Sequence, residues 1–223
     1  METLINSLED LEKILTHPLA GISKNNVVDI QNKFKYIAES LFANFVIQCG
    51  EKIFRFAEIE FYYYKTGEWE DDWNKETYQR NNKHANDLFF HYSGVDICFE
   101  SHFDESKAEF GGILIRSLLD GDNILAGPLY CENIMLNSCS NNLPILKVGD
   151  HINFILKPTK RCNIKSDQQD SMDLNLCYYA HAIKKGDIEK ELNWENTSIR
   201  QEWDKNSKGL KDIYRNYLKD RNF

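Results

Sequence analysis

The stretch KIFRFAEIEFYYY, residues 52–64, carries the strongest structural signal in the chain. Its β-branched and aromatic residues alternate with other side chains, which favours a β-strand over a helix. Because successive side chains of a strand point to opposite faces, Ile59, Phe61 and Tyr63 share one face. Two carboxylates and two phenols share the other face: Glu58, Glu60, Tyr62 and Tyr64. A strand with one apolar face and one face equipped for chemistry indicates an active-site strand.

Two amphipathic helices are expected before this strand. The first is indicated by leucines that recur at spacings of three and four residues: Leu4, Leu8, Leu11 and Leu15. The second has an apolar stripe of the same period: Val27, Ile30, Phe34, Ile37, Leu41 and Phe45. Asn25 or Asn26 can cap its start, and Gly50 is expected to end it. These helices are expected to supply the apolar surface that the sheet meets.

The pattern after residue 64 predicts more strands around a long loop. Residues 65–86 are charged and rich in amides, and they are expected to form a lid or a binding loop. Apolar or alternating segments predict five strands: 88–92, 95–99, 112–118, 151–157 and 174–183. The pair Gly127-Pro128 predicts a turn into a helix with proline at its first position. A peripheral helix is expected in the charged C-terminal region.

The size and composition of the chain fit one α+β domain. With 223 residues, of which 42% are hydrophobic, the chain can bury a substantial core. We expect a single domain over residues 1–223, with N-terminal helices at 1–50, a mixed sheet core at 51–183 and a C-terminal helical extension at 184–223. The N-terminus lacks the basic and apolar start of a secretory signal, and no segment approaches the length that spans a bilayer. A cytoplasmic protein without a membrane partner is therefore expected.

The cysteines and histidines indicate a reducing compartment and no metal site. The six cysteines include no CxxC pair, and several lie in apolar segments where a reduced cysteine behaves as a small hydrophobic residue. The six histidines are not clustered at the spacing of zinc ligands. We expect no metal and no cofactor, and we expect the chain to act as a monomer.

The net charge limits how the chain could hold nucleic acid. A formal charge of -8 argues against binding through bulk electrostatics, because Lys and Arg provide most of the non-specific affinity for phosphate. One local basic patch is a candidate for contacts with a nucleic-acid backbone: Lys157, Lys160, Arg161 and Lys165. The alternative interpretation of this patch is a solvated loop.

Three further polar residues interrupt apolar segments and are candidate site residues. Arg116 ends the run GGILIR, where burial of its charge requires a carboxylate or a ligand as partner. It could bind substrate, or it could form a structural ion pair with Glu58, Glu60 or Asp96. Asp96 interrupts an apolar strand, so it either lies on the wet face or helps to build the site. His91 could be an acid, a base, an orienting group or a structural histidine.

Four segments together resemble the methylpurine DNA glycosylases, also called alkyladenine or 3-methyladenine glycosylases. In that family a strand reading roughly V-E-T-E-A-Y precedes a long loop, two strands, a short apolar strand ending L-L-R-A, and a Gly-Pro turn into a helix. This chain has the segments in the same order: AEIEFYY at 57–63, strands at 88–99, GGILIRSL at 111–118 and AGPLYCENIML at 126–136. The resemblance covers residues 52–136 and implies a curved, mostly antiparallel sheet flanked by helices.

The resemblance also implies a site and a reaction. By position, Glu60 matches the family's water-activating glutamate, Tyr62 its base-stacking tyrosine and Arg116 an arginine near the site. The implied activity is base-excision repair: a damaged purine, alkylated or deaminated, is flipped out of double-stranded DNA and its N-glycosidic bond is hydrolysed. The resemblance implies neither a cofactor nor a metal. Asp71 stands where the family has a histidine. The remaining candidates for substrate binding are Glu58, His91 and Asp96.

Two other functions fit the same residues. A non-catalytic module could use the same face to hold a nucleotide or a protein partner, which the acidic charge favours. A hydrolase of non-DNA N-glycosides could instead pair Glu58 or Glu60 with Asp96 as acid and base. An assay for free base released from damaged duplex DNA, run at low salt, distinguishes these functions.

Overall fold

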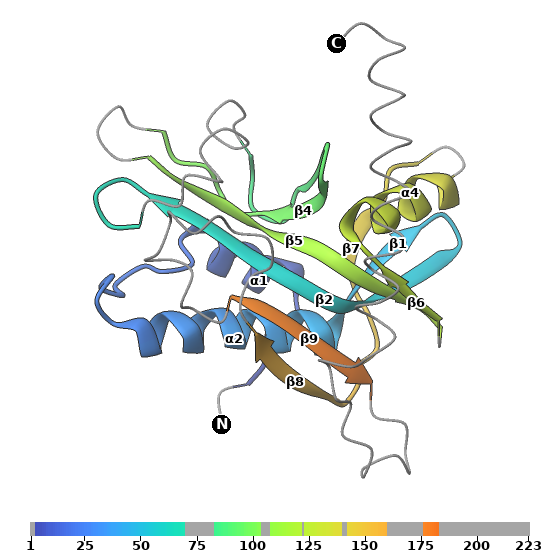
Figure 1. Ribbon diagram of the computed structural model, residues 1–223, viewed down its shortest axis with the longest axis horizontal. Helices are drawn as coiled ribbons and strands as arrows, with labels where there is room; N and C mark the ends of the chain where they lie inside the picture. Colours follow the sequence, from blue (N-terminus) through green and yellow to red (C-terminus); the bar gives the residue numbers. More distant parts are fainter. Residues whose placement is uncertain are drawn as a thin grey trace, which may run out of the picture.

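A computed structural model describes residues 3–69, 83–103, 108–121, 123–139, 142–159 and 176–182. These residues form an α+β domain with a curled antiparallel sheet, as expected for the fold class (Figure 1). Its helices are α1 (Leu8–Thr16), α2 (Val27–Asn44) and α4 (Pro128–Ser138). Its strands are β1 (Phe45–Cys49), β2 (Lys52–Lys65), β3 (Leu88–His91), β4 (Gly94–Cys98), β5 (Glu109–Asp120), β6 (Asn123–Ala126), β7 (Ile145–Val148), β8 (Phe154–Thr159) and β9 (Cys177–Ala182).

The strand predicted from residues 52–64 is confirmed as β2, the centre of the sheet. The main strand order is β3-β4-β5-β2-β1-β7, and β6 pairs with β5. One edge of β2 pairs with β5 from Arg55 to Lys65. Its other edge is shared by β1 near the start and by β9 beside Glu58, Ile59 and Glu60. The segment that carries both glutamates is therefore enclosed by strands on both edges.

The two predicted N-terminal helices are present, and they cover one face of the sheet (Figure 1). Ser7 caps α1, and its side chain accepts a hydrogen bond from the backbone N–H of Asp10. Asn26 caps α2 in the same way, with the N–H of Asp29 as donor. The apolar stripes point inward as expected, since Leu11 of α1 and Phe34 of α2 are fully buried.

The end of the second helix was predicted wrongly. Helix α2 ends at Asn44, not at Gly50, and residues 45–49 form β1. The sequence FVIQC contains apolar residues that extend the helical stripe, but Val46 and Ile47 are β-branched and pair with β7 on one edge. Gly50, at a φ of 59°, then turns the chain from β1 into β2.

The apolar face of β2 forms the core, as the alternation predicted. Ile59 and Phe61 are fully buried, and Tyr63 is nearly so. The ring of Phe61 packs against that of Phe34 with their centroids 4.6 Å apart, which joins β2 to α2. Burying a side chain of this size contributes about 1.5–3 kcal/mol. This packing fixes which side chains of β2 point to the opposite face.

Other predicted elements are confirmed with shifted boundaries. Strand β5 is longer than the predicted 112–118, so Arg116 lies inside it and not at its end. Strand β8 begins at Phe154, three residues after the predicted start, and β6 and β7 were not predicted. The helix after Gly127 begins at Pro128, as predicted. The expected extension at 184–223 lies outside the described residues.

Among the helices that the structure describes, none is both long enough and apolar enough to cross a bilayer.

Candidate active site

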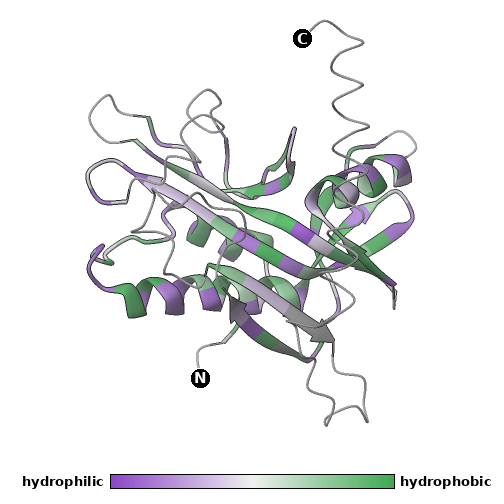
Figure 2. Cartoon of the chain, viewed as in Figure 1, coloured by the Kyte–Doolittle hydropathy of each residue, from purple (hydrophilic) through white to green (hydrophobic). Residues whose placement is uncertain are grey.

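Two glutamates of β2 and one arginine of β5 form a buried ionic cluster. Arg116 Nε donates to Glu58 Oε1 at 3.0 Å, and Arg116 Nη1 donates to Glu60 Oε2 at 2.7 Å. The Arg116 and Glu58 side chains are each 6% exposed, and that of Glu60 is 0% exposed. Figure 2 shows hydrophilic bands interrupting both central strands where they run side by side. Of the two roles considered for Arg116, the ion pair with Glu58 and Glu60 is the one that the structure contains.

The register of the sheet explains why these three side chains meet. Glu58 pairs with Ser117, whereas Ile59 pairs with Ile115, so the ladder is irregular beside Arg116. An irregularity of this kind re-aims side chains and increases the local twist. Here it lets one guanidinium reach the carboxylates of two residues on the neighbouring strand.

Further hydrogen bonds hold both carboxylates. Glu58 accepts from Ser117 Oγ at 3.1 Å and from the thiol of Cys177 on β9 at 3.4 Å. Glu60 Oε1 accepts from the phenol of Tyr62. Glu60, Tyr62 and Arg116, the three residues that the family resemblance grouped, are therefore in direct contact.

The electrostatics of the cluster favour a permanent positive charge on Arg116. Burial acts against that charge, but the carboxylates of Glu60 and Glu58 outweigh it and hold the pKa of the guanidinium well above its ordinary value. Two carboxylates facing one guanidinium leave a formal charge of about -1. Such a site attracts a cation, or a transition state on which positive charge develops.

A second polar cluster lies on the hairpin of β3 and β4. His91 Nε2 lies 3.0 Å from Asp96 Oδ2, and these side chains are 11% and 4% exposed. His91 Nδ1 accepts a hydrogen bond from the backbone N–H of Ser93 at 3.3 Å. Burial lowers the pKa of His91, but the Asp96 carboxylate outweighs this effect and raises it above the ordinary value. Asp96 is therefore buried beside His91 and does not lie on a wet face.

The two clusters share one face of the sheet. Leu114 of β5 is the register partner of Glu60 on one edge and of Asp96 on the other. Directly paired residues of an antiparallel sheet point to the same face. The side chains of Glu60 and Asp96 therefore rise from the same face, two strands apart.

Glu132 of α4 belongs to this region and was missed by the sequence interpretation. Burial raises the pKa of its carboxyl group to about 7, against a smaller opposing effect of His91. The sequence feature that could have indicated its burial is its position four residues after Pro128, on the same side of the helix. This position predicts burial only once the packing of Pro128 is known, because a single glutamate in a helix is ordinarily solvated.

Tyr64 does not join the site, and of the predicted basic patch only Lys157 lies within the described residues. Tyr64 follows Tyr62 on the polar face, but its ring stacks on Phe110 with their centroids 4.6 Å apart, in a separate small cluster. Of the predicted basic patch, Lys157 is partly buried on β8. The other members of the patch lie outside the described residues: Lys160, Arg161 and Lys165.

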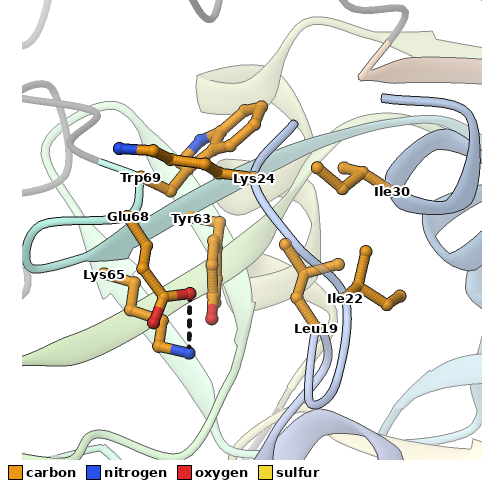
Figure 3. A pocket seen from close by; sticks show the side chains of 8 residues that line it. All are labelled: Leu19, Ile22, Lys24, Ile30, Tyr63, Lys65, Glu68 and Trp69. Atoms are coloured by element: carbon orange, nitrogen blue, oxygen red, sulfur yellow. Dashed lines mark ion pairs between the residues drawn. The ribbon is translucent and has the colours of Figure 1, made fainter. Parts of the chain in front are cut away.

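A small hollow, partly open to solvent, lies on the other side of β2 (Figure 3). Tyr63, on the core face, lines it together with apolar side chains of the α1–α2 connection and with Trp69. The hollow is lined by Leu19, Ile22, Lys24, Ile30, Tyr63, Lys65, Glu68 and Trp69. Because Tyr62 and Tyr63 point to opposite faces, this hollow does not receive the carboxylate cluster.

Comparisons with known proteins return no match: no family model, no curated protein and no solved structure is significantly similar to the chain. Within the described ranges, no group of three or more His, Cys, Asp or Glu side chains is arranged to hold a metal ion. Fold and site together define an α+β domain whose curled antiparallel sheet carries a buried carboxylate–arginine cluster on one face.

Proposed function

We propose that the chain is a hydrolase that cleaves the N-glycosidic bond of a damaged purine in DNA, with Glu60 as the general base. The observation that supports this proposal is the direct contact of Glu60 with both Tyr62 and Arg116. These are the residues that correspond to the functional residues of the methylpurine DNA glycosylases. Glu60 and Arg116 lie on different strands and are 56 residues apart in the sequence. Their contact is therefore a product of the fold and not of proximity along the chain.

In this proposal each oxygen of Glu60 has a different task. Arg116 holds Oε2, which fixes the orientation of the carboxylate. Oε1 accepts from Tyr62 and retains a second lone pair for the proton of an attacking water. The negative cluster would also offset the positive charge that develops on the sugar as the base departs. The Glu60 side chain is fully buried, so in this proposal the Tyr62 phenol moves away to admit water and sugar.

Release of free base from duplex DNA tests this proposal. The substrates are oligonucleotides that carry a single alkylated or deaminated purine, and the assay is run at low salt because the acidic chain has little bulk attraction to phosphate. Glu60→Gln should lower the rate of release by about 10²–10⁴-fold while the protein remains folded, since the amide keeps the shape but cannot take the proton. Unchanged release by this variant would contradict the assignment of Glu60.

A non-catalytic nucleotide-binding or protein-binding module is the second candidate. The observation that favours it is that the carboxylates of Glu58 and Glu60 both have protein partners already. Neither side chain is exposed to a ligand. A domain of this kind would release no base from any damaged duplex and no base from free nucleosides. A hydrolase of non-DNA N-glycosides would act on the nucleosides alone, so the same assay separates all three functions.

A further inference from the structure

Two cysteines meet where the end of α4 packs beside the β1–β2 hairpin. Helix α4 contacts β1 in the folded chain (Figure 1). Cys49 is the last residue of β1, and Cys139 directly follows α4 as its C-cap. Both are free thiols. They lie far apart in the sequence, so their approach is a product of the fold.

The backbones next to the two cysteines are in close contact. A Cβ added at Gly50, the residue after Cys49, would lie 2.9 Å from the carbonyl oxygen of Ser138, the residue before Cys139. Gly50 has no Cβ, so the end of α4 can come this near to the hairpin. Because main-chain groups make this contact, it places the two cysteines close together whichever way either thiol rotates.

The two side chains also share one environment. Cys49 is fully buried in the main hydrophobic core, and Cys139, which is partly exposed, packs against that core. Burial raises the pKa of the Cys49 thiol, and the Cys139 thiol raises it further as a hydrogen-bond partner. Cys49 is therefore unreactive by itself at neutral pH, whereas Cys139 can be reached from solvent.

The other cysteines that the structure describes have different surroundings. The Cys131 thiol donates to a backbone carbonyl group, and the Cys177 thiol donates to Glu58. Cys98 lies in a separate small cluster. All three are fully buried, so an oxidant in solvent reaches Cys139 before it reaches them.

We propose that Cys49 and Cys139 are a redox-sensitive pair that forms a reversible disulfide when the chain meets hydrogen peroxide. The Cys139 sulfur first attacks one oxygen of the peroxide. The O–O bond breaks, Cys139 becomes a sulfenic acid and water leaves. The Cys49 sulfur then attacks the Cys139 sulfur, so that the S–S bond forms, the S–O bond breaks and a second water leaves.

The electrons and protons of this reaction balance. Hydrogen peroxide gains two electrons, each sulfur loses one, and the two thiol protons end in the two water molecules. A dithiol reverses the bond by thiol–disulfide exchange and is itself left as a disulfide.

The bond fastens the end of α4 to β1. It closes a loop of roughly 90 residues, and a cross-link between such distant positions restricts the unfolded chain much more than the folded one. The oxidised protein should therefore unfold at a higher temperature than the reduced protein. Neither the bond nor this effect depends on the hydrolase activity.

Thiol counting on the folded full-length chain tests the pair. The protein is reduced, freed of reductant and treated with hydrogen peroxide, and the remaining thiols are blocked with N-ethylmaleimide in denaturant. The oxidised protein should bind about two fewer N-ethylmaleimide groups than the reduced protein, and dithiothreitol should restore them. After digestion with trypsin, the peptide that ends at Lys52 should be joined to the peptide that ends at Lys147.

Three variants identify the cysteines that form the link. Cys131 lies in the same tryptic peptide as Cys139, so Cys131→Ser is the matched control and should keep the link. Cys139→Ser and Cys49→Ser should each abolish the link and the rise in unfolding temperature. Thermal unfolding of the reduced variants shows that each one is folded, and the partly exposed Cys139 is the position that best tolerates serine.

Several results would overturn the pair. One is a folded wild type that keeps all its thiols in peroxide, and another is a link that persists in Cys139→Ser. A link to Cys162, or between two copies of the chain, would assign the reaction to other partners. Oxidation of Cys139 to a sulfinic acid without any link would show that Cys49 is out of its reach.

Discussion

Arg116 Nη1 donates to Glu60 Oε2 across 2.7 Å, in a contact from which solvent is almost fully excluded. A buried ion pair of this kind gains Coulomb energy but loses the hydration of both charges, so its net contribution to stability is small. Removing one partner is much more costly than removing both, because the charge that remains is buried without compensation. Substitution of a single member of the cluster should therefore have a large effect on the stability of the fold.

Arg116→Met should lower the free energy of unfolding by about 3–5 kcal/mol, because it leaves Glu58 and Glu60 facing each other in the interior. Equilibrium unfolding in urea measures the loss. Breaking the exposed pair of Lys13 and Glu9 with Lys13→Ala is the control and should leave the free energy of unfolding nearly unchanged.

A variant without any of the cluster's charges should be more stable than Arg116→Met alone. Arg116→Met combined with Glu58→Gln and Glu60→Gln removes every charge of the cluster, and it should recover part of the stability lost by Arg116→Met alone. A triple variant that is less stable than the single one would show that the carboxylates are not held by Arg116.

Tyr62 and Tyr63 offer a matched pair of substitutions, because they are neighbours in sequence but point to opposite faces of β2. The Tyr62 phenol donates to Glu60, and the Tyr63 phenol donates to Glu109 Oε1 at 2.8 Å. Tyr62→Phe should change base release while costing little stability. Tyr63→Phe should cost about 1–3 kcal/mol and leave base release unchanged, because it strands a partly buried acceptor away from the site. Swapped effects would mean that the assignment of faces is wrong.

The sequence predicted the parts of the fold that depend on local periodicity. The alternation in residues 52–64 correctly assigned Ile59, Phe61 and Tyr63 to the core, and the Asn26 cap and the Gly127-Pro128 turn were also correct. The boundary at Asn44 was missed because an apolar residue such as Phe45 satisfies a helical stripe and a strand equally well.

The site was predictable only in part, because its members meet through long-range pairing. Sequence reasoning named the possible partners of Arg116, and the register of β2 and β5 selected two of them. It could not foresee that Asp96 would pair with His91, or that α4 would bring Glu132 close to His91. Such contacts depend on the crossing of distant strands, and no spacing along the chain encodes them.

Gly111 permits a close approach of two backbones beside the site. A Cβ added at this position would lie 2.3 Å from the carbonyl oxygen of Tyr62 and 3.1 Å from the Cα of Tyr63. Gly111→Ala therefore has to push β5 away from β2 and should cost about 1–3 kcal/mol or more in unfolding experiments. Lys147→Ala on the exposed edge strand β7 should stay within about 0.5 kcal/mol of wild type, and an equally small effect of Gly111→Ala would contradict the close approach.

Glu132 should make the stability of the fold depend on pH in a direction opposite to that of an ordinary surface carboxylate. Burial raises its pKa from 4.5 to about 7, so the folded state holds this proton over a pH range in which the unfolded state has already lost it. Unfolding then releases a proton between pH 4.5 and about 7, and stability falls as the pH rises through this window. Below the window both states are protonated, and above it both are ionised.

Glu132→Gln isolates this contribution, because its side chain has a similar shape and cannot ionise. The free energy of unfolding of the variant minus that of the wild type should increase steadily from pH 5 to pH 8 and then level off. The remaining titrating groups, including His91, are present in both proteins, so most of their effects cancel in the difference. Urea unfolding of both proteins at half-unit pH intervals measures it. A difference that stays constant over the window would show that burial does not raise the pKa of Glu132.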